Sequence, residues 1–212
     1  MIKRFLPLVF LAFLLTSCEF YKVASITSDT TKEINNSVVF ENDTIKVTYN
    51  FWALNGLMLF DIYNKINVPI YLDWKKSAFI VNDKMMSYWQ DETNTVGVAS
   101  SSAYYLYGGG VGGSSRSKSK SVREERVGVV PPHSYITSSK YSLVPQRTTL
   151  PVQTFNVVTS PLQFRNYLAV STSEQFDKNV FYIDNGFFVS NVKKVRIGKI
   201  RSAQSSAAFY TN

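Results

Sequence analysis

The sequence predicts an all-β protein, an antiparallel sandwich of short strands. Aromatic residues make up 15% of the chain, with 13 Tyr and 15 Phe, and aromatic and β-branched residues are enriched in strands. Short runs of alternating apolar and polar residues recur between turn residues, and no long segment shows the 3.6-residue period of a helix. Short strands at regular spacing are typical of a sandwich or barrel.

The clearest strand runs from Ile45 to Phe51, where apolar residues alternate with polar ones. This alternation indicates one buried face. Asn55-Gly56 then supplies a turn. The nearly continuous apolar run 57–63 predicts a second strand, paired with the first as a hairpin and covered on both faces.

The rest of the chain supplies further strand-like runs bounded by turns. We expect strands at 69–74, 77–81, 85–89, 123–130, 134–143, 155–158, 164–170, 180–183, 187–192 and 195–197. Pro131-Pro132 ends one of these strands, because proline lacks the backbone N–H that a sheet needs. Asp184-Asn185-Gly186 is interpreted as a hairpin turn, since the further acidic ligands of a calcium loop are missing.

The first 17 residues have the parts of a signal peptide. Two basic residues precede the apolar run 5–15, which is shorter than the roughly 20 residues of a membrane-spanning helix and fits a signal-peptide core. Leu15-Thr16-Ser17-Cys18 resembles the lipobox of bacterial lipoproteins, in which a Leu stands three residues ahead of a lipidated Cys. The resemblance predicts cleavage between Ser17 and Cys18, with fatty acid, palmitate included, attached to Cys18.

Cys18 is the only cysteine of the chain, so it has no partner for an internal disulfide. Each buried methylene contributes about 0.8 kcal/mol, so a single acyl chain binds a membrane reversibly and several hold a protein stably. We therefore expect a mature chain that is anchored to a membrane by lipid and does not span it.

The sequence divides into a signal peptide at 1–17, a lipidated N-terminus and polar linker at 18–36, and one sandwich domain at 37–212. Within that domain, segment 100–121 is Gly-rich and then alternates Ser with Arg or Lys. It buries too little apolar surface to offset its ordering entropy, so we predict a long disordered loop. It also lacks the spacing of a phosphate-binding loop.

A candidate partner-contact surface lies at this loop. Its residues are Tyr104, Tyr105, Tyr107, Arg116, Lys118 and Lys120. Tyrosines beside basic residues are suited to a protein partner or a glycan, because each ring combines an apolar body with a polar end. Packing of the tyrosines within a strand or the core is the favoured alternative.

The formal net charge of the chain is +8, and removal of Lys3 and Arg4 with the leader lowers it to +6. A basic surface beside a membrane attracts anionic headgroups, lipopolysaccharide phosphates or other acidic polymers; solubility alone is the other explanation. Nucleic acid is disfavoured, because the leader exports the chain and the basic stretches 116–126 and 193–201 match no nucleic-acid module.

No residue pattern predicts catalysis, a cofactor or a metal site. His133 is the sole histidine and lacks the partners of a zinc site or a catalytic triad. Glu124-Glu125 is the densest carboxylate pair, but neighbours in a strand point to opposite faces, so we expect these residues to pair with Arg123 and Arg126. A non-enzymatic protein without cofactors is predicted.

Several segments resemble small lipoproteins of the Bacteroidetes. They are 63–65, 69–74 with Ser77, 126–132 with Ser134, 160–167 and 181–184. The resemblance spans most of the mature domain, implies an immunoglobulin-like sandwich at the outer membrane, and offers no catalytic residues. Surface display in that group is linked to acidic residues just after the lipidated Cys. Because Glu19-Phe20-Tyr21-Lys22 departs from this pattern, we expect attachment that faces the periplasm, with surface exposure as the alternative.

The function expected from the sequence is a lipid-anchored binding or accessory module whose partner is an envelope protein or a polysaccharide. Two alternatives stay open. A hydrolase of glycan or cell wall requires carboxylates from separate strands to converge in a cleft. A structural subunit of an outer-membrane complex requires a large exposed apolar patch.

The lipidation prediction is tested by Cys18→Ala. Without the thiol there is no atom to acylate, so we expect the leader to stay attached and metabolic labelling with palmitate to disappear. Both are measured on the expressed chain by gel mobility and by autoradiography. Undiminished labelling of the variant contradicts the assignment.

Overall fold

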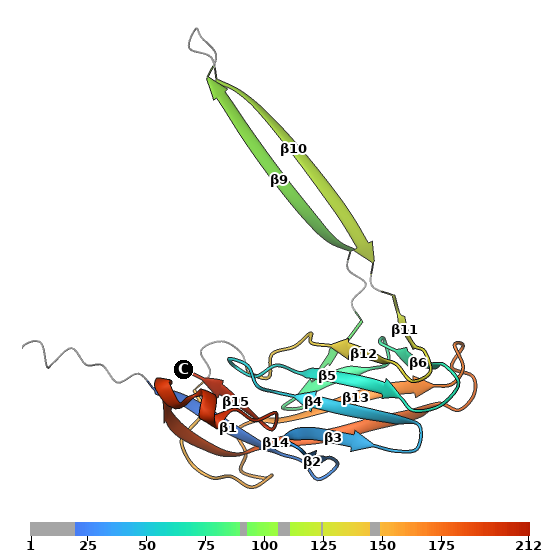
Figure 1. The fold of residues 1–212 in the computed structure, drawn as a ribbon, viewed down its shortest axis with the longest axis vertical. Coiled ribbons are helices and arrows are strands. Elements are labelled where there is room, and N and C mark those ends of the chain that lie inside the picture. The colour runs from blue at the N-terminus through green and yellow to red at the C-terminus, as the bar shows by residue number, and fades with distance from the viewer. Residues whose placement is uncertain (1–19, 90–92, 106–110, 124, 145–148) are drawn as a thin grey trace, which may run out of the picture.

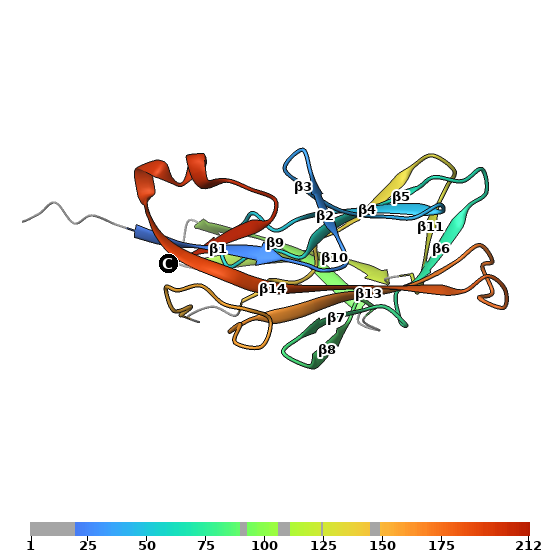
Figure 2. The same cartoon turned by 90° about the horizontal axis from the view of Figure 1, so that it is seen from below.

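The computed structural model describes residues 20–89, 93–105, 111–123, 125–144 and 149–212, and for 93–123 it describes the backbone alone. Two antiparallel sheets pack face to face, with β13 and β14 in one layer and β4 and β5 in the other (Figure 2). The described part of the chain contains no α-helix. The predicted all-β sandwich is therefore confirmed, and its immunoglobulin-like classification stays a prediction.

The larger sheet has eight strands in the order β11-β6-β13-β14-β1-β15, with β7 on β13 and β8 on β7. Its strands are β1 (Phe20–Thr27), β6 (Ile70–Asp73), β7 (Ala78–Val81), β8 (Lys84–Ser87), β11 (Val127–Val130), β13 (Gln163–Ser171), β14 (Phe181–Arg196) and β15 (Ala208–Thr211). Two short 3-10 helices, η2 (Ile197–Lys199) and η3 (Arg201–Ala203), connect β14 to β15.

The smaller sheet has five strands in the order β12-β5-β4-β3-β2. Its strands are β2 (Lys32–Ile34), β3 (Ser37–Glu41), β4 (Ile45–Asn50), β5 (Leu59–Asn64) and β12 (Tyr135–Ser138). A separate two-stranded sheet consists of β9 (Thr93–Tyr105) and β10 (Val111–Arg123), which extends away from the sandwich (Figure 1).

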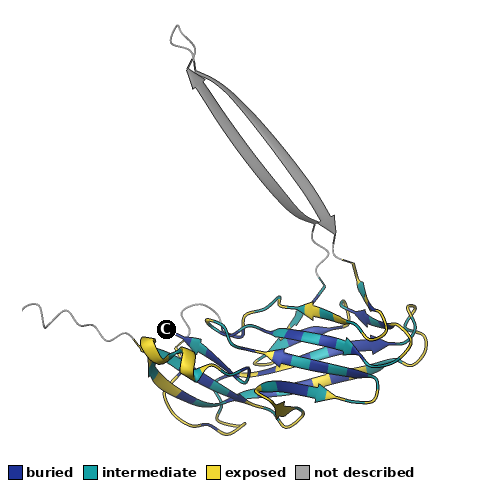
Figure 3. Ribbon diagram, in the orientation of Figure 1, coloured by how far each residue is buried: buried dark blue, intermediate teal, exposed yellow. Residues whose placement is uncertain are grey.

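The core lies between the two large sheets and is rich in aromatic residues. Buried and exposed residues alternate along the strands (Figure 3), as the two-residue period of a strand requires. The largest fully buried side chains include Tyr49, Phe51, Phe60, Phe79, Phe164 and Phe209. Phe51 and Phe187 meet edge to face, with ring centroids 5.1 Å apart, which is a favoured geometry for aromatic pairs.

The Tyr49 hydroxyl is the polar centre of this core. Asn166 on β13 and Asn185 on β14 each donate a side-chain hydrogen bond to it, at 3.1 and 2.8 Å. Asn166 accepts a further hydrogen bond from the Tyr88 hydroxyl at 2.8 Å. Burial raises the pKa of Tyr49 far above that of a free tyrosine, so the phenol stays neutral. The network links the smaller sheet to the two central strands of the larger one.

A second polar link holds the chain where it returns from β10 to β11. The buried carboxylate of Asp73 receives two hydrogen bonds from Arg126, with Nη2 to Oδ2 at 2.7 Å. Burial by itself raises the pKa of Asp73, but the hydrogen bonds from Arg126 and from the backbone N–H groups of Lys76 and Lys75 outweigh it and hold the pKa below its ordinary value. Arg126 therefore pairs with Asp73, where the sequence predicted a glutamate partner.

Most predicted strands are confirmed. The alternating run from Ile45 forms β4 and pairs with β5, although β5 is buried on one face only, because the smaller sheet has solvent on its outer side. Asn55 and Gly56 have positive φ, as the predicted turn requires. The expected strand at 155–158 is not formed.

Three predictions about the chain's organisation are wrong. The polar segment 18–36 is not a linker in its described part, because β1 enters the larger sheet between β14 and β15. Segment 100–121 is not an open loop over its described residues, since β9 and β10 pair along their full length. Asp184-Asn185-Gly186 lies inside β14, where Asn185 is held by Tyr49.

Removing the Tyr49 hydroxyl tests the core network. Tyr49→Phe leaves two buried amides without their acceptor, and an unsatisfied buried polar group costs about 1–3 kcal/mol. We expect the free energy of unfolding in urea to fall by that amount. Tyr135→Phe is the matched control, because Tyr135 is 67% exposed. Equal stability of the two variants contradicts a structural role for the network.

Candidate functional site

Five of the six predicted contact residues, Tyr104, Tyr105, Arg116, Lys118 and Lys120, lie on the β9–β10 hairpin. The two strands pair from Thr93 opposite Arg123 to Tyr105 opposite Val111. Each of them hydrogen-bonds only to the other in the described structure, so both outer edges of the hairpin are open. Tyr107 and the lipidation site Ser17-Cys18 lie outside the described residues.

The pairing register places the three predicted cations on one face of the hairpin. Arg116, Lys118 and Lys120 occupy alternate positions of β10, opposite Ser100, Val98 and Val96. Residues at alternate positions of a strand share a face. Tyr104 and Tyr105 are neighbours in β9 and therefore belong to opposite faces. From 93 to 123 the sequence contains four basic residues and no Asp or Glu.

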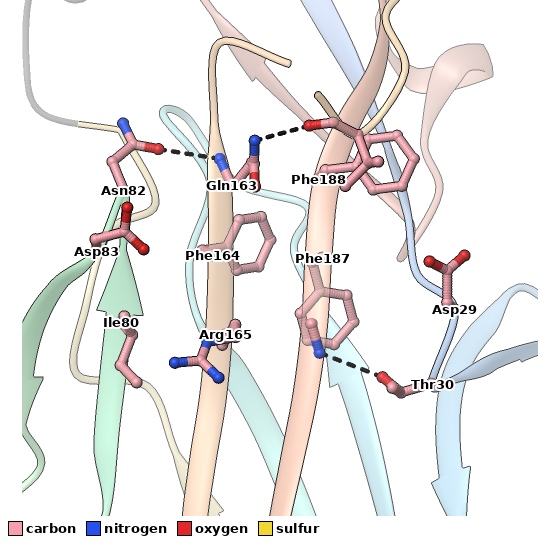
Figure 4. A pocket seen from close by; sticks show the side chains of 12 residues that line it. Asp29, Thr30, Ile80, Asn82, Asp83, Gln163, Phe164, Arg165, Phe187 and Phe188 are labelled. Carbon is pink, nitrogen blue, oxygen red and sulfur yellow. Dashed lines mark hydrogen bonds between the residues drawn. The ribbon is translucent and has the colours of Figure 1, made fainter. Parts of the chain in front are cut away.

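A cleft of about 380 Å³ lies on the larger sheet (Figure 4). Its floor is formed by β13 and β14, with Arg165 directly opposite Gly186. One wall is the β7–β8 turn, where Asn82 and Asp83 adopt the positive φ of a tight two-residue turn. The other wall is the connection from β1 to β2, which carries Asp29.

The walls are tied to the floor by hydrogen bonds. The Asn82 side-chain carbonyl accepts from the backbone N–H of Gln163 at 3.1 Å. On the opposite side, the Gly186 N–H donates to the Thr30 hydroxyl at 3.2 Å (Figure 4). Thr30 thus satisfies a strand donor at a point where β1 has already ended.

Several polar groups of the cleft keep hydrogen-bonding capacity. Among the described residues, neither Asp29 nor Asp83 makes an ion pair or a side-chain hydrogen bond. Gln163 donates its amide to the Val157 carbonyl at 2.7 Å and keeps its own side-chain carbonyl. Arg165 donates through Nη1 to Asp184 at 2.6 Å and keeps its remaining N–H groups. Acceptors and donors therefore face the same space.

Apolar groups complete the cleft and continue it. Ile80, Val157 and Phe188 line it together with the polar groups. A neighbouring cavity of about 230 Å³ shares Ile80 and Arg165 and extends past Tyr167. The ring of Tyr167 stacks on that of Tyr182 at 5.4 Å, and burial, with the nearby Tyr182 and Asp184, raises the pKa of Tyr167. The two cavities form an elongated mixed surface.

Gly186 has no side chain, so it leaves open space at the centre of the cleft floor. A Cβ built there finds only the Arg165 side chain, at 3.9 Å, so the space above it is open. Its φ does not lie in the left-handed region, so the backbone does not require glycine. Glycine inside a strand often marks a place where a ligand approaches closely.

A larger hollow of about 690 Å³ lies between β11 and β12. Its wall includes the Trp74 indole, which packs so closely on Gly128 that an added Cβ would stand 2.6 Å from Nε1. Lys140 at its rim donates to the Tyr88 carbonyl at 2.8 Å. Thr137, also in its lining, donates to the Asp61 carboxylate at 2.6 Å, so two polar groups of this hollow are used by contacts within the fold.

The remaining candidates are placed as follows. His133 is exposed, has a positive φ of 54° and makes a hydrogen bond of 2.7 Å to Asn67. No group of three or more metal-ligating side chains converges within the described residues. In the described part of the chain, no helix is long and apolar enough to cross a membrane.

No local pattern in the amino-acid order predicts the cleft, because its walls and floor come from five separate segments. Their proximity depends on the pairing of β7 with β13 and of β13 with β14. The pattern closest to the cleft is Asp184-Asn185-Gly186, which predicts a turn. In the structure these residues continue β14, and Gly186 lies in the floor of the cleft. Comparisons with known protein families, with curated proteins and with solved structures found no match for this chain.

Proposed function

We propose that this chain is a lipid-anchored protein of the cell envelope that binds a polysaccharide without catalysing a reaction. The proposed anchor is Cys18 in the outer membrane, with the domain facing the periplasm. The sandwich, proposed to be immunoglobulin-like, acts as the scaffold. The cleft on β13 and β14 receives a sugar unit, and the β9–β10 hairpin supplies a second contact.

The observation that carries this proposal is the mixture of groups in the cleft. Sugar hydroxyls donate and accept hydrogen bonds, and they find acceptors in Asp29, Asp83 and Gln163 and donors in Arg165. The apolar faces of a sugar ring fit against Ile80 and Phe188. Binding sites commonly combine apolar walls with a few convergent polar groups in this way.

Other ligand classes fit the cleft less well. An anion meets two carboxylates without ion pairs and a single guanidinium that already pairs with Asp184. A purely apolar ligand removes those carboxylates from water without replacing the lost hydrogen bonds, which is costly. The continuation of the cleft past Tyr167 favours a chain of sugars over a single ring.

The hairpin supports a polymeric partner with acidic groups. Its cations at 116, 118 and 120 share one face, and like charges on one face of a sheet destabilise it. An isolated two-stranded sheet is itself marginally stable in water. An anionic partner lying along this face offsets both costs.

Filling the floor of the cleft tests the sugar site. Gly186→Leu places a side chain in the open space, so we expect binding to weaken at least about tenfold, or about 1.4 kcal/mol. The probes are chitotetraose and maltotetraose, measured by titration calorimetry on the full chain in mild detergent. Gly198→Leu is the matched control, because Gly198 is exposed and a Cβ there has no atom within 4 Å.

The midpoint of urea unfolding first verifies that each variant is folded, so that a loss of binding can be assigned to the cleft. The proposal predicts saturable binding of at least one tetrasaccharide by the unaltered chain and by Gly198→Leu. Asp83→Ala, at an exposed wall position, should weaken it as well. If neither sugar binds at about 10 mM, or if Gly186→Leu binds as tightly as the unaltered chain, the cleft is not the site.

The hairpin contact is tested by replacing Arg116, Lys118 and Lys120 with Ser. The probe is polygalacturonate, an acidic polysaccharide, and binding is measured by interferometry over a range of salt concentrations. We expect at least about tenfold weaker binding and a shallower salt dependence, because fewer counterions are displaced.

The matched control replaces Lys32, Lys84 and Lys178 with Ser. These lysines are exposed and lie on separate elements, so the change in net charge is the same. The control should keep most of the affinity. If the two triple variants lose affinity equally, net charge explains the binding and the hairpin has no special part in it.

A further inference from the structure

One end of the sandwich carries a basic surface beside the first described residue. There β1 begins with Phe20 opposite Arg196, followed by Lys22 opposite Lys194. The helices η2 and η3 continue from β14 and lie next to the start of β1 (Figure 1). We call this surface the basic end face. It consists of Lys22, Lys194, Arg196, Lys199 and Arg201.

The charges of the basic end face have no paired acidic side chain in the described part of the chain. From 191 to 212 the sequence contains no Asp or Glu. Lys22 and Lys194 stand directly opposite each other across two strands, an arrangement that is unfavourable for like charges. None of the five side chains makes an ion pair with a described residue, so these charges are open to an anion from outside the described part of the chain.

Exposed apolar residues lie among these charges. Phe20 on β1 and Ile197 on η2 are each 46% exposed. Phe20 pairs with Arg196, and Ile197 follows Arg196 in the chain. Apolar side chains flanked by cations are suited to a membrane surface, where the former enter the boundary of the acyl region and the latter meet lipid phosphates.

The proposed anchor places this face at the membrane. Phe20 follows Cys18 by two residues, and two extended residues span at most about 7 Å. Because β1 begins at Phe20, no long spacer separates the lipid from the sandwich. Acyl chains attached to Cys18 therefore enter the bilayer next to the basic end face.

We propose that the basic end face lies on anionic lipid headgroups and fixes the orientation of the domain on the membrane. This inference rests on the lipid anchor of the proposed function and goes beyond it, since an anchor alone leaves the domain free to rotate. Lys194, Arg196, Lys199 and Arg201 contact phosphates while Phe20 and Ile197 enter the headgroup layer. The hairpin belongs to other strands, and the cleft uses β14 around Gly186, away from Arg196, so both stay available to a ligand.

The experiment uses the full lipidated chain reconstituted in two kinds of vesicle. One is phosphatidylcholine alone and the other contains about 30% phosphatidylglycerol. Hydrogen exchange of the segments 20–24 and 193–203 is followed by mass spectrometry. We expect these segments to exchange several-fold more slowly on the anionic vesicles, and the difference to shrink as salt screens the charges.

A variant with Lys194, Arg196 and Lys199 changed to Gln should lose this difference between the two vesicles. The control with Lys32, Lys84 and Lys178 changed to Gln should keep it, because its loss of charge is the same. These six residues are exposed, so all of the substitutions are compatible with the fold.

The possible results distinguish the inference from the anchor. Slower exchange on anionic vesicles in the unaltered chain and the control, but not in the variant, supports the basic end face. Equal exchange on both vesicles, with firm association to each, overturns it and leaves the anchor intact. Failure of the chain to associate with phosphatidylcholine vesicles overturns the anchor and, with it, this inference.

Discussion

The Tyr49 hydroxyl fixes how the two sheets meet. It is buried between them and accepts hydrogen bonds from Asn166 and Asn185, which stand opposite each other on β13 and β14. Hydrogen bonds are stronger in the low dielectric of a core, and an unpaired polar group is correspondingly costly there. The apolar contacts around Tyr49 tolerate small shifts, whereas these bonds are satisfied in one alignment only. The side-chain carbonyl of Asn185 finds no hydrogen-bond partner among the described residues, so even this alignment leaves one buried acceptor unsatisfied.

The same network determines what the outer surface of the larger sheet presents. Neighbouring residues of a strand point to opposite faces. Because Asn166 and Asn185 face the core, the adjoining pair of Arg165 and Gly186 faces outward and forms the floor of the cleft. A slip of one residue would exchange the two faces, burying Arg165 and exposing the asparagines. The geometry of the cleft is therefore a consequence of packing on the other side of the sheet.

Sequence patterns predicted the parts of the fold that follow local rules. The alternation from Ile45 predicted β4, and Asn55-Gly56 predicted the turn that follows it. The sequence patterns failed where the composition of a segment suggests one structure and the spacing of its residues suggests another. The Gly and Ser content of 100–121 indicated disorder, although its alternation of Ser with basic residues has the period of a strand. The pairing of Arg126 with Asp73, and the cleft itself, depend on contacts between distant segments and have no local signature.

The position of β1 changes the meaning of the basic residues near the C-terminus. In the sequence, segment 193–201 is a basic stretch. In the fold it pairs with β1, so that Lys194 stands opposite Lys22 and Arg196 opposite Phe20. Like charges that stand opposite each other on paired strands do not stabilise a fold, because their repulsion opposes the pairing of the strands. Interior contacts therefore do not explain why this end of the sandwich is cationic. A compensating anion does, and the lipid anchor proposed at Cys18 makes the headgroups of a bilayer its proposed source.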